Sequence, residues 1–189
     1  MLQPLYNWTM RLAGHRRALW ALAGIAFVES SVFPIPPDIL LVPMILARRE
    51  KAWLFAGVAT LASVLGGMAG YAIGLGLYEA VARPLLDGPA FAEFQELYGE
   101  HGGWIVFTAG ITPFPYKVIT IASGVVGLAL PTFILASVLA RGLRFYIEAA
   151  LLWKFGPPIR DFIEKRLALV VTVFVVGLVG GFLALELFL

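Results

Sequence analysis

Two short stretches, VFPIPPD at residues 32–38 and ITPFPYK at residues 111–117, decide how this chain is expected to fold. Each places Pro-x-Pro inside apolar sequence, two residues before a single charge: Asp38 in the first and Lys117 in the second. Proline removes a backbone donor, and its ring clashes with the preceding helical turn. Hydrocarbon cannot satisfy the backbone groups that are freed, so such a break survives in a membrane only where protein or water covers it. Two such breaks predict a membrane protein with a polar site at depth, as in a transporter.

Composition places the whole chain in a membrane. Hydrophobic residues make up 60% of its 189 residues and charged residues only 14%, whereas soluble domains are near half apolar and about a quarter charged. The chain has room for roughly four to six membrane segments of about 20 residues each. It has no cysteine, and its two histidines, His15 and His101, lie far apart in sequence. We therefore expect no metal and no cofactor. We also expect no nucleic-acid partner, because the basic residues flank apolar segments.

The basic residues predict the topology. Lys and Arg concentrate in the cytoplasmic flanks of membrane segments, and basic clusters both precede and follow the apolar region 18–47. A re-entrant hairpin that enters from the cytoplasm and returns keeps both clusters inside, and the uncharged run 52–78 then leads out. The acidic segment 79–102 suits the outer face, and a second hairpin around 103–130 enters from there. A helix after it leads back in and delivers further basic residues to the cytoplasm.

The expected fold is therefore all-α and integral to the membrane: an inverted repeat of two re-entrant helical hairpins, each followed by a transmembrane helix, plus a C-terminal transmembrane helix. A shift of 79 residues lays the first Pro-x-Pro and Asp38 over the second and Lys117, and inverted repeats with broken helices recur in transporters. The hairpin tips fall at four prolines, which are Pro34, Pro36, Pro113 and Pro115. One membrane domain, 1–189, with a cytoplasmic N-terminus, divides into six expected parts: an N-terminal surface helix 1–17, the first repeat 18–78, the acidic external segment 79–102, the second repeat 103–153, the basic cytoplasmic segment 154–166 and the C-terminal transmembrane helix 167–189.

Four motifs, in order, resemble those of the DedA family, also called the VTT or SNARE-associated Golgi protein family. They are ESSVFPIPPD at 29–38, GGMAGYAIG at 66–74, TPFPYKVITIASG at 112–124 and RGLRF at 141–145. The sequence of the second hairpin most resembles that of the YqaA branch. The resemblance implies a multi-pass protein of the bacterial inner membrane, not an enzyme, that moves lipids between leaflets as a flippase or scramblase linked to the proton-motive force. Undecaprenyl phosphate and phospholipids are the lipids that it implies.

One departure from the family pattern concerns the second turn. Many DedA proteins carry two arginines around it, whereas this chain has Gly110 and Ile111 near the first position and Lys117 near the second. Lysine is a strongly hydrated point charge, and arginine offers a planar fork that matches phosphate. We therefore expect the lipid headgroup, or the strength with which it is held, to differ from that of better-known members.

Six ionisable residues lie inside apolar sequence: Glu29, Asp38, Lys117, Arg141, Arg144 and Glu148. A charge at the centre of a spanning helix costs about 2.5–3.5 kcal/mol on insertion scales. One interpretation is that the six neutralise one another, Asp38 with Lys117 and Arg144 with Glu148 as an ion pair at i,i+4 spacing. The other is functional. In it Lys117, Arg141 and Arg144 bind the lipid phosphate, and Glu29 and Asp38 take up protons. Both interpretations stay open at this point.

A glycine face is predicted on the helix that follows the first hairpin. Gly66, Gly70 and Gly74 recur every fourth residue, which lets another helix approach closely. The face packs either against a hairpin arm of the same chain or against a second copy in a homodimer.

Other function classes remain beside lipid translocation. A proton- or cation-coupled small-solute transporter would suit two half-hairpins equally well. A non-transporting membrane scaffold would carry its buried charges at a needless cost. A membrane enzyme acting on lipid phosphate is disfavoured, because no histidine or cysteine lies near the motifs to act as a nucleophile or to activate one. Membrane lipids, through a phosphate headgroup, and protons are thus the expected partners.

Overall fold

The regular elements of the described chain are helices. The computed structural model describes residues 17–33, 35–78, 80, 89–112, 114–156 and 158, and no strand occurs among them. In chain order the helices are α2 (Ala18–Ser31), α3 (Asp38–Ala47), the 3₁₀ helix η1 (Arg49–Lys51), α4 (Ala52–Leu77), α6 (Pro89–Ile111), α7 (Tyr116–Val126) and a long last helix, Leu130–Gly156. The expected all-α fold is confirmed for this part of the chain.

Two helical segments are long and apolar enough to cross a membrane, Arg49–Leu77 and Leu130–Gly156. Large apolar side chains point outward from them and from their neighbours; Leu61, for example, is 64% exposed and Trp104 71%. Soluble monomers rarely expose so much apolar surface in one continuous region, whereas hydrocarbon surroundings accept it. Length, composition and surface all favour a membrane protein.

Several expected parts fall outside the described residues. They are residues 1–16 of the surface helix, most of the basic segment 154–166, the C-terminal helix 167–189 and two of the four tip prolines, Pro34 and Pro113.

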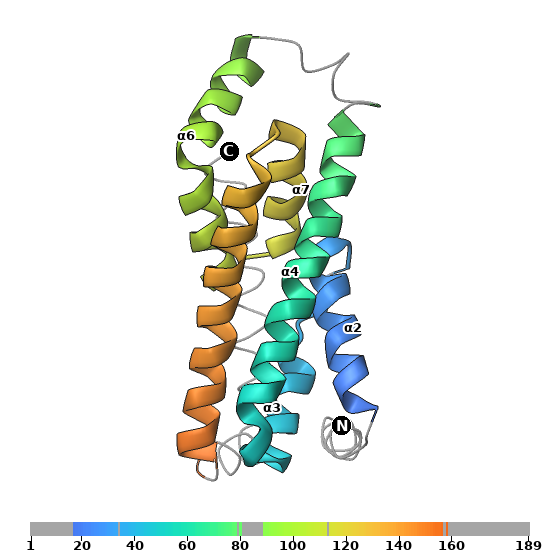
Figure 1. Ribbon diagram of the computed structural model, residues 1–189, viewed down its shortest axis with the longest axis vertical. Helices are drawn as coiled ribbons and strands as arrows, with labels where there is room; N and C mark the ends of the chain where they lie inside the picture. The colour runs from blue at the N-terminus through green and yellow to red at the C-terminus, as the bar shows by residue number, and fades with distance from the viewer. Residues whose placement is uncertain are drawn as a thin grey trace, which may run out of the picture.

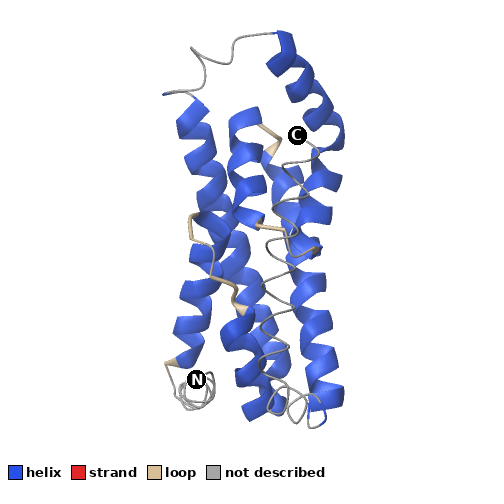
Figure 2. Ribbon diagram, turned by 180° about the vertical axis from the view of Figure 1, so that it is seen from behind, coloured by secondary structure: helices blue, strands red, loops and turns tan. Residues whose placement is uncertain are grey.

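Two half-length hairpins approach each other from opposite ends of the molecule (Figure 1). Helix α2 runs from the lower end to mid-height, α3 returns to the lower end, and α4 then runs the full length. Helix α6 descends from the upper end, α7 returns toward it, and Leu130–Gly156, in orange, runs back to the lower end. Seen from behind, the connections at the hairpin tips are short loops (Figure 2). The two turns therefore meet near the middle of the molecule.

Proline places the start of each return arm. Pro37 precedes α3 with φ −65°, and Pro115 precedes α7 with φ −61°, the value to which the proline ring confines the backbone. The missing N–H costs nothing there, because the first turn of a helix has no acceptor for it. Asp38 lies in the first turn of α3, where a negative charge suits the helix dipole. Lys117, in the first turn of α7, has the opposite sign.

Helix α6 is longer than the sequence indicated. It begins at Pro89 and continues to Ile111, so it joins part of the acidic segment expected at 79–102 to the first arm of the second hairpin. Glu96 and Glu100, which suggest a loop in a hydropathy reading, lie on its exposed side. Helix α7 ends at Gly127, whose φ of 71° is the left-handed conformation that glycine adopts at helix ends.

The glycine face of α4 contacts the backbones of both hairpins. A Cβ added at Gly66 would lie 2.1 Å from the carbonyl oxygen of Phe27 in α2, and one at Gly74 would lie 2.0 Å from that of Ile121 in α7. A Cβ at Gly70, between them, would lie 2.3 Å from the Thr120 hydroxyl oxygen. The three glycines thus let α4 approach one arm of each hairpin within the same chain. Dimerisation through this face stays a prediction.

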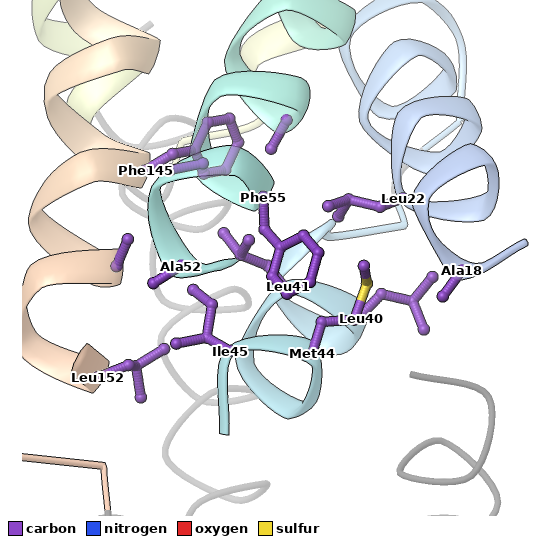
Figure 3. Packing of buried hydrophobic residues seen from close by; sticks show 13 residues of the cluster. Ala18, Leu22, Leu40, Leu41, Met44, Ile45, Ala52, Phe55, Phe145 and Leu152 are labelled. Carbon is purple, nitrogen blue, oxygen red and sulfur yellow. The ribbon is translucent and has the colours of Figure 1, made fainter. Parts of the chain in front are cut away.

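Two apolar clusters fill the ends of the molecule. The lower cluster joins α2, α3, α4 and the end of the last helix; Leu41 and Phe55 lie in its middle, and Phe145 lies at its upper edge (Figure 3). The upper cluster joins α6, α7 and the start of the last helix; it includes Tyr116 and Phe133. Between the two clusters the last helix carries Arg141 and Arg144, which pair with Glu29 and Asp38. We call this region the polar layer, and it contains the candidate site.

Candidate functional site

Arg141 is the centre of a sealed polar network. Its side chain is fully buried, and its Nη2 donates to Glu29 Oε2 at 2.9 Å while its Nε donates to Ser63 Oγ at 2.7 Å. Ser30 Oγ donates to Glu29 Oε2 at 3.0 Å and lies 2.7 Å from Ser63 Oγ. The network joins α2, α4 and the last helix. Bringing these charges out of water is tolerable because they are paired and also hydrogen-bonded to neighbours.

Aromatic rings enclose the rest of the Arg141 guanidinium. Its Cζ lies 4.6 Å from the centroid of the Phe145 ring and 5.0 Å from that of Tyr116, within the range of a cation–π interaction. The Tyr116 hydroxyl in turn donates to Ser137 Oγ. One donor, Arg141 Nη1, has no hydrogen-bond partner among the described residues.

A second ion pair joins α3 to the same long helix. Arg144 Nη2 lies 2.8 Å from Asp38 Oδ2, and each side chain is 21% exposed. Arg144 Nη1 also donates to the carbonyl oxygen of Thr112, at the second turn, at 3.4 Å. This pair is therefore accessible where the first is sealed, although the two arginines are only three residues apart.

Glu148 lies beside Asp38. Asp38, Arg144 and Arg141 are charged groups close enough to interact electrostatically with Glu148. The sequence left open an ion pair between Arg144 and Glu148, but the carboxylate that Arg144 binds is Asp38.

Lys117 joins the tips of the two hairpins. Its Nζ donates to the carbonyl oxygen of Val32, at the first turn, at 3.3 Å. Nearby, Thr120 Oγ1 donates to the carbonyl oxygen of Ser30 at 3.0 Å. The alternative pairing of Lys117 with Asp38 is replaced by this backbone contact, since Asp38 is bound to Arg144. The two tip prolines that are described, Pro36 and Pro115, flank the same region and are half-buried.

The structure adds site residues that the sequence did not indicate. Ser30, Ser63, Thr120, Tyr116 and Ser137 are all buried and all bond within the polar layer. Serine and threonine are common in membrane helices and carry no periodic signal that distinguishes these positions. Among the described residues no three His, Asp or Glu side chains gather as metal ligands would.

An apolar groove runs beside the polar layer, between α4 and the last helix. Its volume is about 320 Å³, and it is lined by Gly57, Thr60, Leu61, Val64, Val138 and Tyr146. The Thr60 hydroxyl donates to the carbonyl of Ala56 in its own helix at 2.8 Å, so it offers the groove no free donor. The lining suits hydrocarbon better than a polar headgroup.

Comparison with known proteins identifies the family. The VTT domain matches residues 35–154, a range that includes both arginines and Asp38 but starts after Glu29. An uncharacterized protein of Haemophilus influenzae is 35% identical over 167 residues, covering 85% of this chain and 87% of the relative. A second uncharacterized protein, from Histophilus somni, is 35% identical over 168 residues with the same coverage. No solved structure matches the chain. The chain therefore belongs to the VTT domain family, the DedA family of membrane proteins, whose members are generally of the transporter type.

Proposed function

We propose that this protein moves a phosphate-bearing lipid, such as undecaprenyl phosphate or a phospholipid, across the bacterial inner membrane in a cycle linked to the proton-motive force. The observation that carries the proposal is the pair of arginine–carboxylate bridges that join the first hairpin to the last helix where the hairpin tips meet. Ionisable groups kept in pairs inside a membrane protein are costly, and they mark a transport pathway more often than a scaffold.

Positive charge converges on the accessible part of this layer. Arg144 presents a planar fork that can bind a phosphate through two parallel hydrogen bonds. Lys117 and the N-terminus of α7 lie at the adjoining tip, and a helix N-terminus favours an anion. Arg141, which is fully buried, adds a further positive charge three residues before Arg144 on the same helix. A lipid phosphate would take the place of the Asp38 carboxylate on Arg144.

In this proposal, protonation of a carboxylate lets the lipid phosphate replace it on the arginine. A carboxylate bound to arginine competes with the phosphate, whereas a protonated carboxyl does not. Protonation of Asp38 would free Arg144 and protonation of Glu29 would free Arg141, because a neutral carboxyl no longer holds the arginine by charge. A proton from the side of high concentration would thus open the phosphate site.

The membrane topology belongs to the same proposal. We propose that both hairpins are re-entrant and form an inverted repeat, with the N-terminus in the cytoplasm and the chain in a YqaA-like branch of the family. The hydrocarbon tail would lie in the groove between α4 and the last helix while the phosphate occupies the polar layer. Because the native chain has no cysteine, single cysteines at residues 48–51 report the topology cleanly, and labelling from outside intact cells would contradict it.

Lipid movement in proteoliposomes tests the function. Fluorescent phosphate-bearing lipids are reconstituted with the purified protein, and a membrane-impermeant quencher reports the fraction in each leaflet, with and without a pH gradient. We expect faster exchange than in protein-free vesicles, accelerated by the gradient, and equal exchange in the control variant Glu100→Gln, whose side chain is exposed. Exchange no faster than in protein-free vesicles would refute the proposal, and gradient-driven uptake of a small anion in its place would identify a small-solute transporter.

A further inference from the structure

Basic side chains gather at the lower end of the molecule, where α4 begins and the last helix ends (Figure 1). Arg49 lies across the end of the last helix. Its Nη2 donates to the carbonyl oxygen of Lys154 at 3.5 Å, and a Cβ added at Gly156 would lie 3.3 Å from its Nε. The Lys154 side chain is exposed at the same end. The seam between the two long helices therefore has a positively charged lower end.

This positive charge is not neutralised within the described part of the chain. Neither Arg49 nor Lys154 takes part in an ion pair there, and Glu50, next to Arg49 in sequence, is exposed and pairs with neither. Arg49 Nε is buried and has no hydrogen-bond partner among the described residues. A guanidinium has five N–H donors, and a buried donor without an acceptor costs free energy. Arg49 therefore has unused capacity to bind an anion.

Aromatic rings connect the basic end of the seam to the apolar groove. Trp53 follows Arg49 by four residues on one continuous helical segment, hence on the same face. Its ring stacks on that of Tyr146 with 6.1 Å between centroids, and the Trp153 ring lies 6.2 Å away. All three side chains are exposed, and Tyr146 also lines the groove. Tryptophan and tyrosine favour the depth of lipid headgroups, so the seam has the polarity profile of one membrane leaflet.

The length of the seam also fits one leaflet. At 1.5 Å per residue, Leu61 of the groove lies about 18 Å along the helix from Arg49. The hydrocarbon of one leaflet is about 15 Å deep, half of a core of about 30 Å. A molecule whose phosphate contacts Arg49 could therefore extend a hydrocarbon chain into the groove.

We propose that this seam binds an anionic phospholipid of the leaflet at the lower end. The phosphate contacts Arg49 and Lys154, the region between phosphate and chains lies beside the aromatic rings, and one acyl chain occupies the groove. Its role rests on the lipid transport proposed above: the site holds a lipid at the membrane surface before the headgroup moves to the polar layer. Binding itself requires no transport.

The same features disfavour other occupants of the groove. A soluble phosphate would leave the apolar groove unused. A second copy of the chain, related by a two-fold axis, would set the same patch against itself and bring the two basic ends together without carboxylates from the described residues to separate them. A phospholipid supplies both the negative charge and the hydrocarbon.

Native mass spectrometry measures the binding directly. We would titrate the full-length protein in detergent with phosphatidylglycerol, or with zwitterionic phosphatidylcholine, and obtain the dissociation constant of the first bound lipid. Phosphatidylglycerol should bind more tightly, and Arg49→Gln and Lys154→Gln should each weaken it about fivefold while leaving phosphatidylcholine unchanged. Lys51→Gln is the matched control, because position 51 lies two residues before Trp53 and faces away from the seam. Equal affinity of the wild type for the two lipids, or an equal loss in Lys51→Gln, would overturn the proposal.

A second pair of variants tests the groove. Val138 lines it, whereas the next residue, Leu139, does not, and both side chains are exposed. Val138→Phe should fill the groove and weaken both lipids, and Leu139→Phe should bind them as the wild type does. Unchanged binding in Val138→Phe would overturn the proposal, as would displacement of the lipid by glycerol 3-phosphate, which has the phosphate without the chains. A wild-type dimer that Val138→Phe converts to a monomer, with lipid affinity unchanged, would assign the groove to a second copy.

Transport then tests the role of the site. In proteoliposomes the double variant Arg49→Gln with Lys154→Gln should slow the exchange of labelled phosphatidylglycerol, and Lys51→Gln should not. Exchange as fast in the double variant as in the wild type would overturn the role in transport. If lipids bind as expected while the wild-type protein moves none, the binding site stands and the proposed lipid transport fails.

Discussion

The two ion pairs of the polar layer use the same chemistry in different surroundings. Glu29–Arg141 has a fully buried arginine, a carboxylate that is only 13% exposed and several further hydrogen bonds. Asp38–Arg144 is 21% exposed on both sides and has one further long bond to a backbone carbonyl. Both connect the first hairpin to the last helix. The difference teaches that sequence spacing alone does not assign a role, because greater burial holds one pair more firmly, as a clamp, and smaller burial makes the other the easier one to exchange partners.

Removing one member of the sealed pair should have the largest effect. Arg141→Met leaves Glu29 buried without a counter-charge, and breaking a buried pair in this way costs about 3–5 kcal/mol. Arg144→Met should cost less, because the Asp38–Arg144 pair is less buried and has fewer further hydrogen bonds. Denaturation midpoints in one detergent compare the two variants. The double variant Glu29→Gln with Arg141→Met should recover part of the loss, and equal costs for Arg141→Met and Arg144→Met would remove the distinction between clamp and exchangeable pair.

Replacing arginine by lysine should separate the pairs by function. Arg144→Lys keeps the charge but loses the planar fork, and losing a charge-assisted hydrogen bond of about 1.5–3 kcal/mol predicts a roughly 10- to 100-fold slower lipid exchange. Lys117→Arg is the matched control, because a point charge suffices at that tip, and its exchange rate should be unchanged or higher. Normal exchange in Arg144→Lys would show that this arginine serves only to hold Asp38.

A change outside the polar layer should disturb the sealed pair through its helix. Gly66→Ala would push a Cβ into the carbonyl of Phe27, two residues before Glu29 in α2, and overpacking of this kind costs about 1–3 kcal/mol. Gly76→Ala is the control, since nothing lies within 4 Å of its added Cβ, and it should be neutral or slightly stabilising. Thermal unfolding followed by circular dichroism measures both. Equal stability of Gly66→Ala and the wild type would mean that α2 can move away from the added Cβ with no loss of stability.

The sequence predicted the breaks and the long helices better than it predicted the partners. Proline has one local effect on a backbone, so Pro36 and Pro115 located the turns from sequence alone. Ion pairing is tertiary. Spacing on one helix offered Glu148 to Arg144, and only the approach of α3 places Asp38 there instead. The serines of the sealed network gave no signal, because a hydroxyl in a membrane helix usually bonds its own backbone, as Thr60 does.

The start of α6 was unpredictable for a related reason. Its acidic residues suggested an external loop, but acids on the exposed side of a helix leave its backbone hydrogen bonds intact. Hydropathy measures what a segment contains and not which way each side chain points. The glycine face, in contrast, gave a clear signal but left two possible partners open. Within this chain it packs against the backbone of Phe27 and of Ile121.

The two apolar clusters also bear on what a proton-linked transport cycle, as proposed above, would have to prevent. A carrier that binds protons in the membrane would let protons leak across it if water connected its site to both compartments at once. Below the arginines, Leu41, Phe55 and Phe145 are at most 3% exposed, and above them Phe133 is fully buried. A chain of water through either cluster would need unpaired polar partners that these side chains do not offer. In that proposal the two clusters would separate the sealed Glu29–Arg141 pair from both ends of the described part of the molecule, and a proton would reach that pair only after the protein moves.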